Sequence, residues 1–175
     1  MLTRNDELNV LRTDISALKG SPAEIKDRIL DFLILAYADG MHDVEQQLDS
    51  TATFDVNRME EVIYQPIDGM TFDERVDQWI YLEDYEAITR LAENERERVY
   101  NTSAYDTATN LKARFKTWHC QMLPTSRDTH IYLNGMVKPM NEPFYTYNGN
   151  SAMHPGGFGV ATEDINCRCY CTYSK

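Results

Sequence analysis

Apolar residues in the first two-thirds of the chain recur at the spacing of a helix. The first set lies three or four positions apart on one stripe: Leu8, Leu11, Ile15 and Leu18. Gly20 is expected to end this helix, and Ser21 to Glu24 has the form of a capping box with proline at the first helical position. A second helix should then run to about Asp39, where Gly40 supplies a left-handed stop. Its apolar residues cover more than half of its circumference, which predicts the central buried helix.

Four further helical segments are expected before residue 111. Residues 41–68 predict two short pieces separated by a polar bridge. Thr71 to Glu74 is another capping box and opens a helix with Val76, Trp79 and Ile80 on one face. A long helix follows from near Asp84. Its charged middle, Glu93 to Arg98, is expected to be a solvated face with short-range ion pairs, and the alternative is a partner surface.

From Leu111 onward the apolar spacing changes from helical to alternating. Arg114 to Cys120 predicts a strand, and further strands are expected at residues 136–140, 144–147 and 165–173. The predicted fold class is therefore α+β. An α-helical, acidic body of residues 1–111 precedes a small module of residues 112–175, made of short antiparallel strands and one short helix.

The short helix of the module is expected to begin at Thr125, which lies three residues before Asp128 and can cap it. It should end at Asn134-Gly135. This arrangement places Arg127 and His130 on one helical face.

The charge of the chain is divided unevenly. The net charge is −11, but residues 1–111 hold 10 Lys and Arg against 24 Asp and Glu, whereas residues 112–175 hold 7 against 4. The acidic part repels nucleic acid, so we expect the main partner to be a protein. No apolar run is long enough to span a bilayer, and residues 1–6 lack an apolar signal core. We therefore expect a protein of the cytosol with no membrane partner and reduced cysteines.

Several thiols and imidazoles of the module are candidate metal ligands: His119, Cys120, His130, Cys167, Cys169 and Cys171. On a strand, the last three cysteines would share one face. With a histidine or Cys120 they have the donor types of a tetrahedral zinc site. Their spacing is not the two-residue gap of a zinc knuckle, so we expect no cofactor and thiols that pack as small hydrophobes. A zinc-stabilised interaction module is the alternative.

Arg127 and His130, with Glu163 or Asp164, are residue types that bind anions or transfer protons. They can equally fasten the short helix to the last strand, through an Arg–carboxylate pair and a His–backbone bond. We favour this structural role because no nucleophile or metal motif accompanies them. The chain is therefore not expected to be an enzyme. The alternative is a nuclease or a nucleotide-using transferase with Arg127, His130 and Glu163 as its site.

Five separated elements of the last third resemble the C-terminal domain of the phage Mu F-like minor head proteins, also called phage head morphogenesis proteins. The matching residues follow one another in the family's order: Trp118, Arg127, His130, Gly135, Phe144, Pro155, Gly156, Asn166, Cys167, Arg168 and Cys169. Two departures are His154, where the family usually has an aromatic residue, and Cys171, which adds a third thiol. Trp118 and Phe144 are also the expected core aromatics.

The resemblance implies a low-copy virion protein, assembled in the host cytoplasm and located in the phage head. It further implies an association with the portal region, portal or capsid proteins as partners, and a role in head morphogenesis or in DNA packaging and ejection. From the residues themselves, we expect the apolar-striped helix of residues 8–18 to leave the core and to lie in a groove of its partner.

Overall fold

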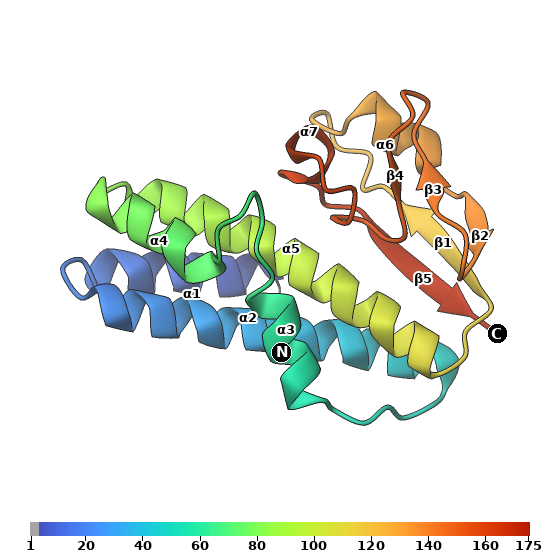
Figure 1. Cartoon of the computed structure of the whole chain (residues 1–175), viewed down its shortest axis with the longest axis horizontal. Helices are drawn as coiled ribbons and strands as arrows, with labels where there is room; N and C mark the ends of the chain where they lie inside the picture. Colours follow the sequence, from blue (N-terminus) through green and yellow to red (C-terminus); the bar gives the residue numbers. More distant parts are fainter. Residues whose placement is uncertain (1–3) are drawn as a thin grey trace.

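Two long helices, α2 (Pro22–Leu48) and α5 (Tyr85–Asn110), lie side by side and run in the same direction (Figure 1). Three shorter helices pack against this pair: α1 (Arg4–Ala17), α3 (Val56–Ile63) and α4 (Phe72–Tyr81). The structure is a computed structural model that describes residues 4–175, with side chains from residue 6 onward. No helix in this part of the chain is long and apolar enough to cross a membrane.

The C-terminal module lies against the second half of the helix pair (Figure 1). Its main sheet has the antiparallel order β2-β1-β5, with β1 at Phe115–His119, β2 at Val137–Pro139 and β5 at Tyr170–Ser174. Strands β3 (Phe144–Tyr145) and β4 (Ser151–Ala152) form a separate hairpin. Two short helices, α6 (Asp128–Leu133) and α7 (Ala161–Asp164), complete the module. The α+β prediction is confirmed.

Helix α2 continues through the position at which the sequence predicted its end. Gly40 lies inside the helix, and the left-handed residue that ends it is Asp49, at φ +46°. A β-carbon on Gly40 would lie 2.3 Å from the carbonyl oxygen of Tyr100 on α5. The glycine is therefore needed for the close approach of two helices. Next to this crossing, Ser103 donates a hydrogen bond to the carbonyl of Tyr37.

The charged middle of α5 is buried, which contradicts the expected solvated face. Glu95, Arg96 and Glu97 are 3%, 6% and 7% exposed. Glu95 accepts hydrogen bonds from Arg75 and Arg98, each at 2.8 Å. Arg96 lies 3.3 Å from Asp39 of α2 and 3.4 Å from Glu7 of α1. The charges are paired between elements, so they link the helices instead of facing water.

Helix α1 belongs to the core as well. Its apolar stripe is buried, with Leu11 and Ile15 at most 1% exposed, among residues of α2, α4 and α5. The expected groove-binding face is therefore already covered by the rest of the chain.

The helix caps agree only in part with the sequence. Thr71 forms the expected capping box with Glu74. Ser21 precedes α2 but makes no side-chain capping bond. Helix α6 begins after Arg127, not at Thr125. The last strand begins at Tyr170, five residues later than predicted, because a turn at residues 165–166, with Asn166 left-handed (φ +58°), precedes the extended chain.

The apolar interior has two parts. One lies between α1, α2, α3, α4 and α5. The other is formed by the module together with Val44 and Leu48 of α2 and Ala104 and Ala108 of α5. The predicted boundary at residue 111 therefore crosses a shared core.

We predict that Gly40→Ala lowers the free energy of unfolding by about 1–3 kcal/mol, the usual cost of overpacking. Alanine is a better helix former than glycine by about 1 kcal/mol, so helix propensity alone would raise the free energy of unfolding. Urea denaturation measures the change, with Asp31→Ala on the exposed face of the same helix as the control. A Gly40→Ala protein as stable as wild type would contradict the close crossing.

Candidate functional site

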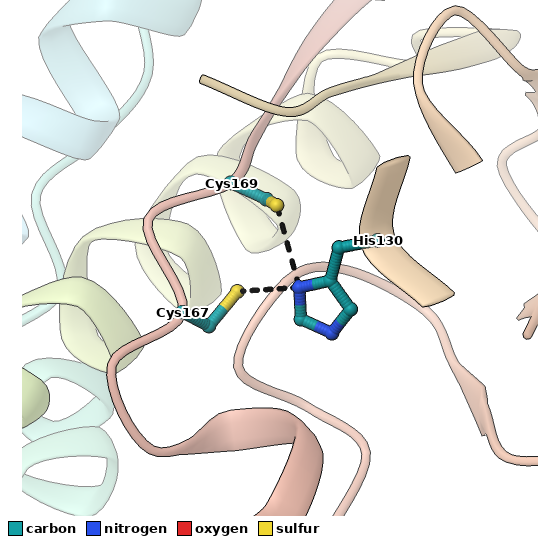
Figure 2. Close-up of side chains that lie close together, drawn as sticks. All are labelled: His130, Cys167 and Cys169. Atoms are coloured by element: carbon teal, nitrogen blue, oxygen red, sulfur yellow. Dashed lines mark hydrogen bonds between the residues drawn. The ribbon is translucent and has the colours of Figure 1, made fainter. Parts of the chain in front are cut away.

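One histidine and two cysteines converge inside the C-terminal module. Nδ1 of His130 lies 3.5 Å from Sγ of Cys167 and 3.5 Å from Sγ of Cys169 (Figure 2). All three side chains are buried. Their potential ligand atoms lie within 4.8 Å of one another. From the sequence, a zinc site of the three cysteines with a histidine or Cys120 was only the alternative; the structure brings together His130, Cys167 and Cys169.

The elements around the group explain its geometry. His130 is in α6, which ends where Asn134 and the left-handed Gly135 turn the chain. Cys167 and Cys169 lie between α7 and β5, on an alternating stretch that directs Arg168 outward. Arg168 pairs with Glu93 of α5 at 2.6 Å, and the backbone N–H of Asn166 donates to Asn94 at 2.8 Å. The cysteine segment is thus attached to α5 on both sides of Cys167.

The other nitrogen of His130 faces a carboxylate. Nε2 lies 3.1 Å from Oε2 of Glu163, at an angle too bent for a hydrogen bond, so the contact is electrostatic. Glu163 is buried and accepts hydrogen bonds from Thr129 at 2.9 Å, Asn150 at 3.0 Å and Asn148 at 3.3 Å. Burial alone would raise the pKa of Glu163, but these bonds and His130 together lower it, so the carboxylate is ionised.

The two thiols differ in protonation. A hydrogen bond from Cys169, together with His130, lowers the pKa of Cys167 to about 5, against the effect of burial. The same bond and burial raise the pKa of Cys169, while the indole of Trp118 acts in the opposite direction. The pair therefore holds one thiolate and one thiol near neutral pH.

Aromatic rings enclose the group. Trp118 meets His130 edge-on at 5.8 Å, and Phe158 stacks on His130 at 5.6 Å between ring centroids. Trp118 also contacts Phe144 at 5.1 Å, as expected for core aromatics. On one side, Cys167 lines a cavity of about 720 Å³ between α5, residues 65–70 and residues 153–165. Aromatic rings therefore line one part of the site and the polar cluster around Glu163 another, and a cavity lies next to Cys167.

The remaining candidate ligands lie elsewhere. His119 bonds the Thr172 hydroxyl at 2.8 Å and stacks on Tyr170. Cys171 is buried opposite Trp118 in the β1–β5 pair, and burial raises the pKa of its thiol to about 12. Cys120 is also buried, outside the group of three. No disulfide joins the four cysteines.

Arg127 does not share the site of His130 and Glu163. Its guanidinium donates to the backbone carbonyl of Ile165, whereas His130 meets Cys167 and Glu163. The sequence predicted an Arg–carboxylate pair and a His–backbone bond, but in the structure Arg127 bonds a backbone carbonyl and His130 faces a carboxylate. Both side chains still join α6 to the segment before β5. Of the other signature residues, Gly156 lies after Pro155 with its Cα facing Arg98 of α5.

The sequence analysis missed four polar residues of this region. Three of them hold Glu163: Thr129, Asn148 and Asn150. They lie in a turn or at a helix start, where such residues are common, so their position in the sequence did not mark them as site residues. The fourth is Lys116, buried in β1. Its ammonium donates to the carbonyls of Met153 (2.8 Å) and Met140 (3.2 Å), and lies over the rings of Tyr105 and Phe144. Its inward position in the alternating strand was the available signal.

The fold and the site define a helical scaffold that bears a small, rigid Cys/His module. The chain belongs to the phage Mu protein F like family, whose profile matches residues 55–172. This confirms the resemblance found from the motifs. Membership indicates a phage head protein of the virion that assembles with other head proteins.

A search of curated proteins gave a relative with an enzyme's name. The chain is 34% identical over 109 residues to the NAD(+)–arginine ADP-ribosyltransferase EFV of Enterococcus faecalis. The match includes 58% of this chain but only 22% of the relative. The chain thus spans about a fifth of the length of that protein. No solved structure matches the chain.

The buried lysine yields a prediction on pH. Burial lowers the pKa of Lys116 to about 8, from 10.5 for an exposed lysine. Between these values the unfolded state binds more protons than the folded state, so Lys116 makes stability rise with pH in this window and not below pH 8. Urea midpoints of wild type should rise relative to Lys116→Met from pH 8 to 10.5. The control is Lys112→Met at an exposed lysine, whose urea midpoints should change with pH as those of wild type do. If the midpoints of Lys116→Met and wild type change with pH in parallel, Lys116 has no such effect.

Proposed function

We propose that this chain is a low-copy structural protein of the phage head that docks on the portal or the inner capsid. The observation that supports this most is its membership of the phage Mu protein F like family over residues 55–172. The structure adds a rigid body of two linked helices with a module fastened to it, which suits docking. A role in DNA packaging or ejection would follow from that location.

Exposed tyrosines of the module are the surface we propose for docking. Tyr132 of α6 and Tyr147 after β3 are 51% and 62% exposed and contact each other edge to face at 5.8 Å. Tyr145, also exposed, lies two residues before Tyr147. Tyrosine is enriched at interfaces because it offers large apolar area at low entropy cost. Of the surfaces considered from the sequence, the stripe of α1 is buried, and so is the middle of the run from Glu93 to Arg98, at Glu95 to Glu97.

DNA is not the proposed main partner. The helical body, residues 1–111, holds 24 acidic against 10 basic residues. Duplex binding depends on Lys and Arg that neutralise phosphates, so this surface repels the backbone. A protein surface of the head suits it better.

The chain is proposed to act without enzymatic activity. His130 and Glu163 are buried, and Arg127 is bonded to a backbone carbonyl, so the three do not line an open cleft. Cys167, His130 and Glu163 follow one another in space as a nucleophile, a base and an orienting acid would, but Cys167 as a residue is only 3% exposed. The activity named for the Enterococcus relative belongs to a protein of which this chain covers 22%.

We predict that the double change Tyr132→Ala and Tyr147→Ala leaves the melting temperature near that of wild type and weakens portal or capsid binding at least about 10-fold, as loss of interface tyrosines does. The measurement is the number of copies per purified procapsid, together with a pull-down on portal protein. The control is Tyr81→Ala, 87% exposed on the helical body. Normal incorporation of the double variant would place the docking surface elsewhere.

A second prediction concerns the absence of enzymatic activity. When the purified chain is incubated with labelled NAD(+) and the proteins of the phage head, it should transfer no label above the background seen without the chain, and Glu163→Gln should give the same background. Transfer by wild type that Glu163→Gln abolishes, at equal thermal stability, would overturn the structural role of Glu163.

A further inference from the structure

We propose that His130, Cys167 and Cys169 form a zinc site with one coordination position open to water. This site goes beyond the docking role and does not depend on it. It also replaces the expectation that these thiols only pack as hydrophobes.

The spacing of the three atoms fits one metal ion. Zinc binds sulfur at about 2.3 Å and imidazole nitrogen at about 2.0–2.1 Å, in a tetrahedral arrangement. A sulfur and a nitrogen on the same zinc ion are then about 3.5 Å apart. Both Nδ1-to-Sγ distances in the structure are 3.5 Å (Figure 2). Both sulfurs point to the same nitrogen, so one ion reaches all three ligands.

The surroundings of His130 are those of a metal ligand. Zinc-binding histidines usually direct the second ring nitrogen at a carboxylate or carbonyl, which fixes the ring and keeps the first nitrogen free for the metal. Here Glu163 lies 3.1 Å from Nε2, which orients the ring electrostatically although the angle is too bent for a hydrogen bond, and Glu163 is itself held by Thr129, Asn148 and Asn150. Thiols that merely fill space need no such buried carboxylate.

The donor set selects the metal. Two sulfurs and one imidazole suit zinc, whereas magnesium and calcium prefer oxygen. Zinc binds cysteine as the thiolate, so both sulfurs are deprotonated in the metal-bound site and their protons pass to solvent. The net charge of the three ligands and the ion is then zero, which suits an apolar interior.

Water is the fourth ligand we assign. Among the described neighbours that offer a further donor, His119 bonds the hydroxyl of Thr172, and Cys171 is not in the group whose ligand atoms lie within 4.8 Å of one another. Cys120 lies outside the group within which ligand atoms approach to 4.8 Å. Cys167 lines the cavity of about 720 Å³, which provides room for water.

Such an ion would join α6 to the segment before β5. That segment is already attached to α5 through Asn94 and Glu93. Bound zinc would therefore hold the module in one piece against the long helix, and its removal should lower stability.

The test is metal analysis of the full chain, purified without added chelator and dialysed against metal-free buffer. We expect about one zinc per chain, and a melting temperature that falls by at least about 5 °C when a chelator removes it. Cys167→Ser and Cys169→Ser should each lose most of the zinc. Cys120→Ser and Cys171→Ser, equally buried cysteines, are the matched controls and should keep it.

A second measurement uses the wild-type protein, so that it does not depend on whether the variants fold. Cobalt added to the apoprotein should give the near-ultraviolet charge-transfer band of thiolate–cobalt bonds and the visible spectrum of a tetrahedral ion. Less than a tenth of a zinc per chain, together with no such spectrum, would refute the site. Loss of zinc in a control variant that is still folded would show that the ligands are assigned wrongly.

Discussion

The close contact of α2 and α5 is the constraint on which the rest of the structure depends. A glycine on α2 lets the two backbones meet, since a β-carbon at Gly40 would lie 2.3 Å from the Tyr100 carbonyl oxygen. Both apolar cores take residues from this pair: Ile29 and Val99 in the first, and Val44 and Ala104 in the second. The buried charges of α5 follow from the same contact, because Arg96 meets Asp39 of α2 there. The module therefore folds onto a surface that exists only when the two helices are paired.

This dependence also positions the candidate site. The segment with Cys167 and Cys169 is attached to α5 through Asn94 and Glu93, and α6 brings His130 to it from the other side. Glu163 closes the arrangement behind the imidazole. The result is a rigid, buried group in a module whose exposed tyrosines face outward. With docking proposed for the tyrosines, the buried group would hold the fold and a separate surface would contact the partner.

The sequence predicted the features that depend on local pattern. The α+β class, the capping box at Thr71 and the inward direction of the three alternating cysteines all follow from spacing, and the structure has them. The end of α2 was wrong because glycine serves equally in a left-handed stop and in a helix crossing, and only the position of Tyr100 distinguishes the two. The buried charges of α5 were missed for a similar reason. Their partners Arg75, Asp39 and Glu7 lie far away in sequence. The meeting of His130 with Cys167 likewise joins residues 37 positions apart.

Native-state hydrogen exchange, followed peptide by peptide in increasing denaturant, tests most directly whether the module depends on the helix pair. The amides of β1 and β5 should open with the same free energy and the same denaturant dependence as those of α2 and α5, because one shared core links them. Exchange from the strands at clearly lower free energy, while the long helices stay protected, would contradict this account.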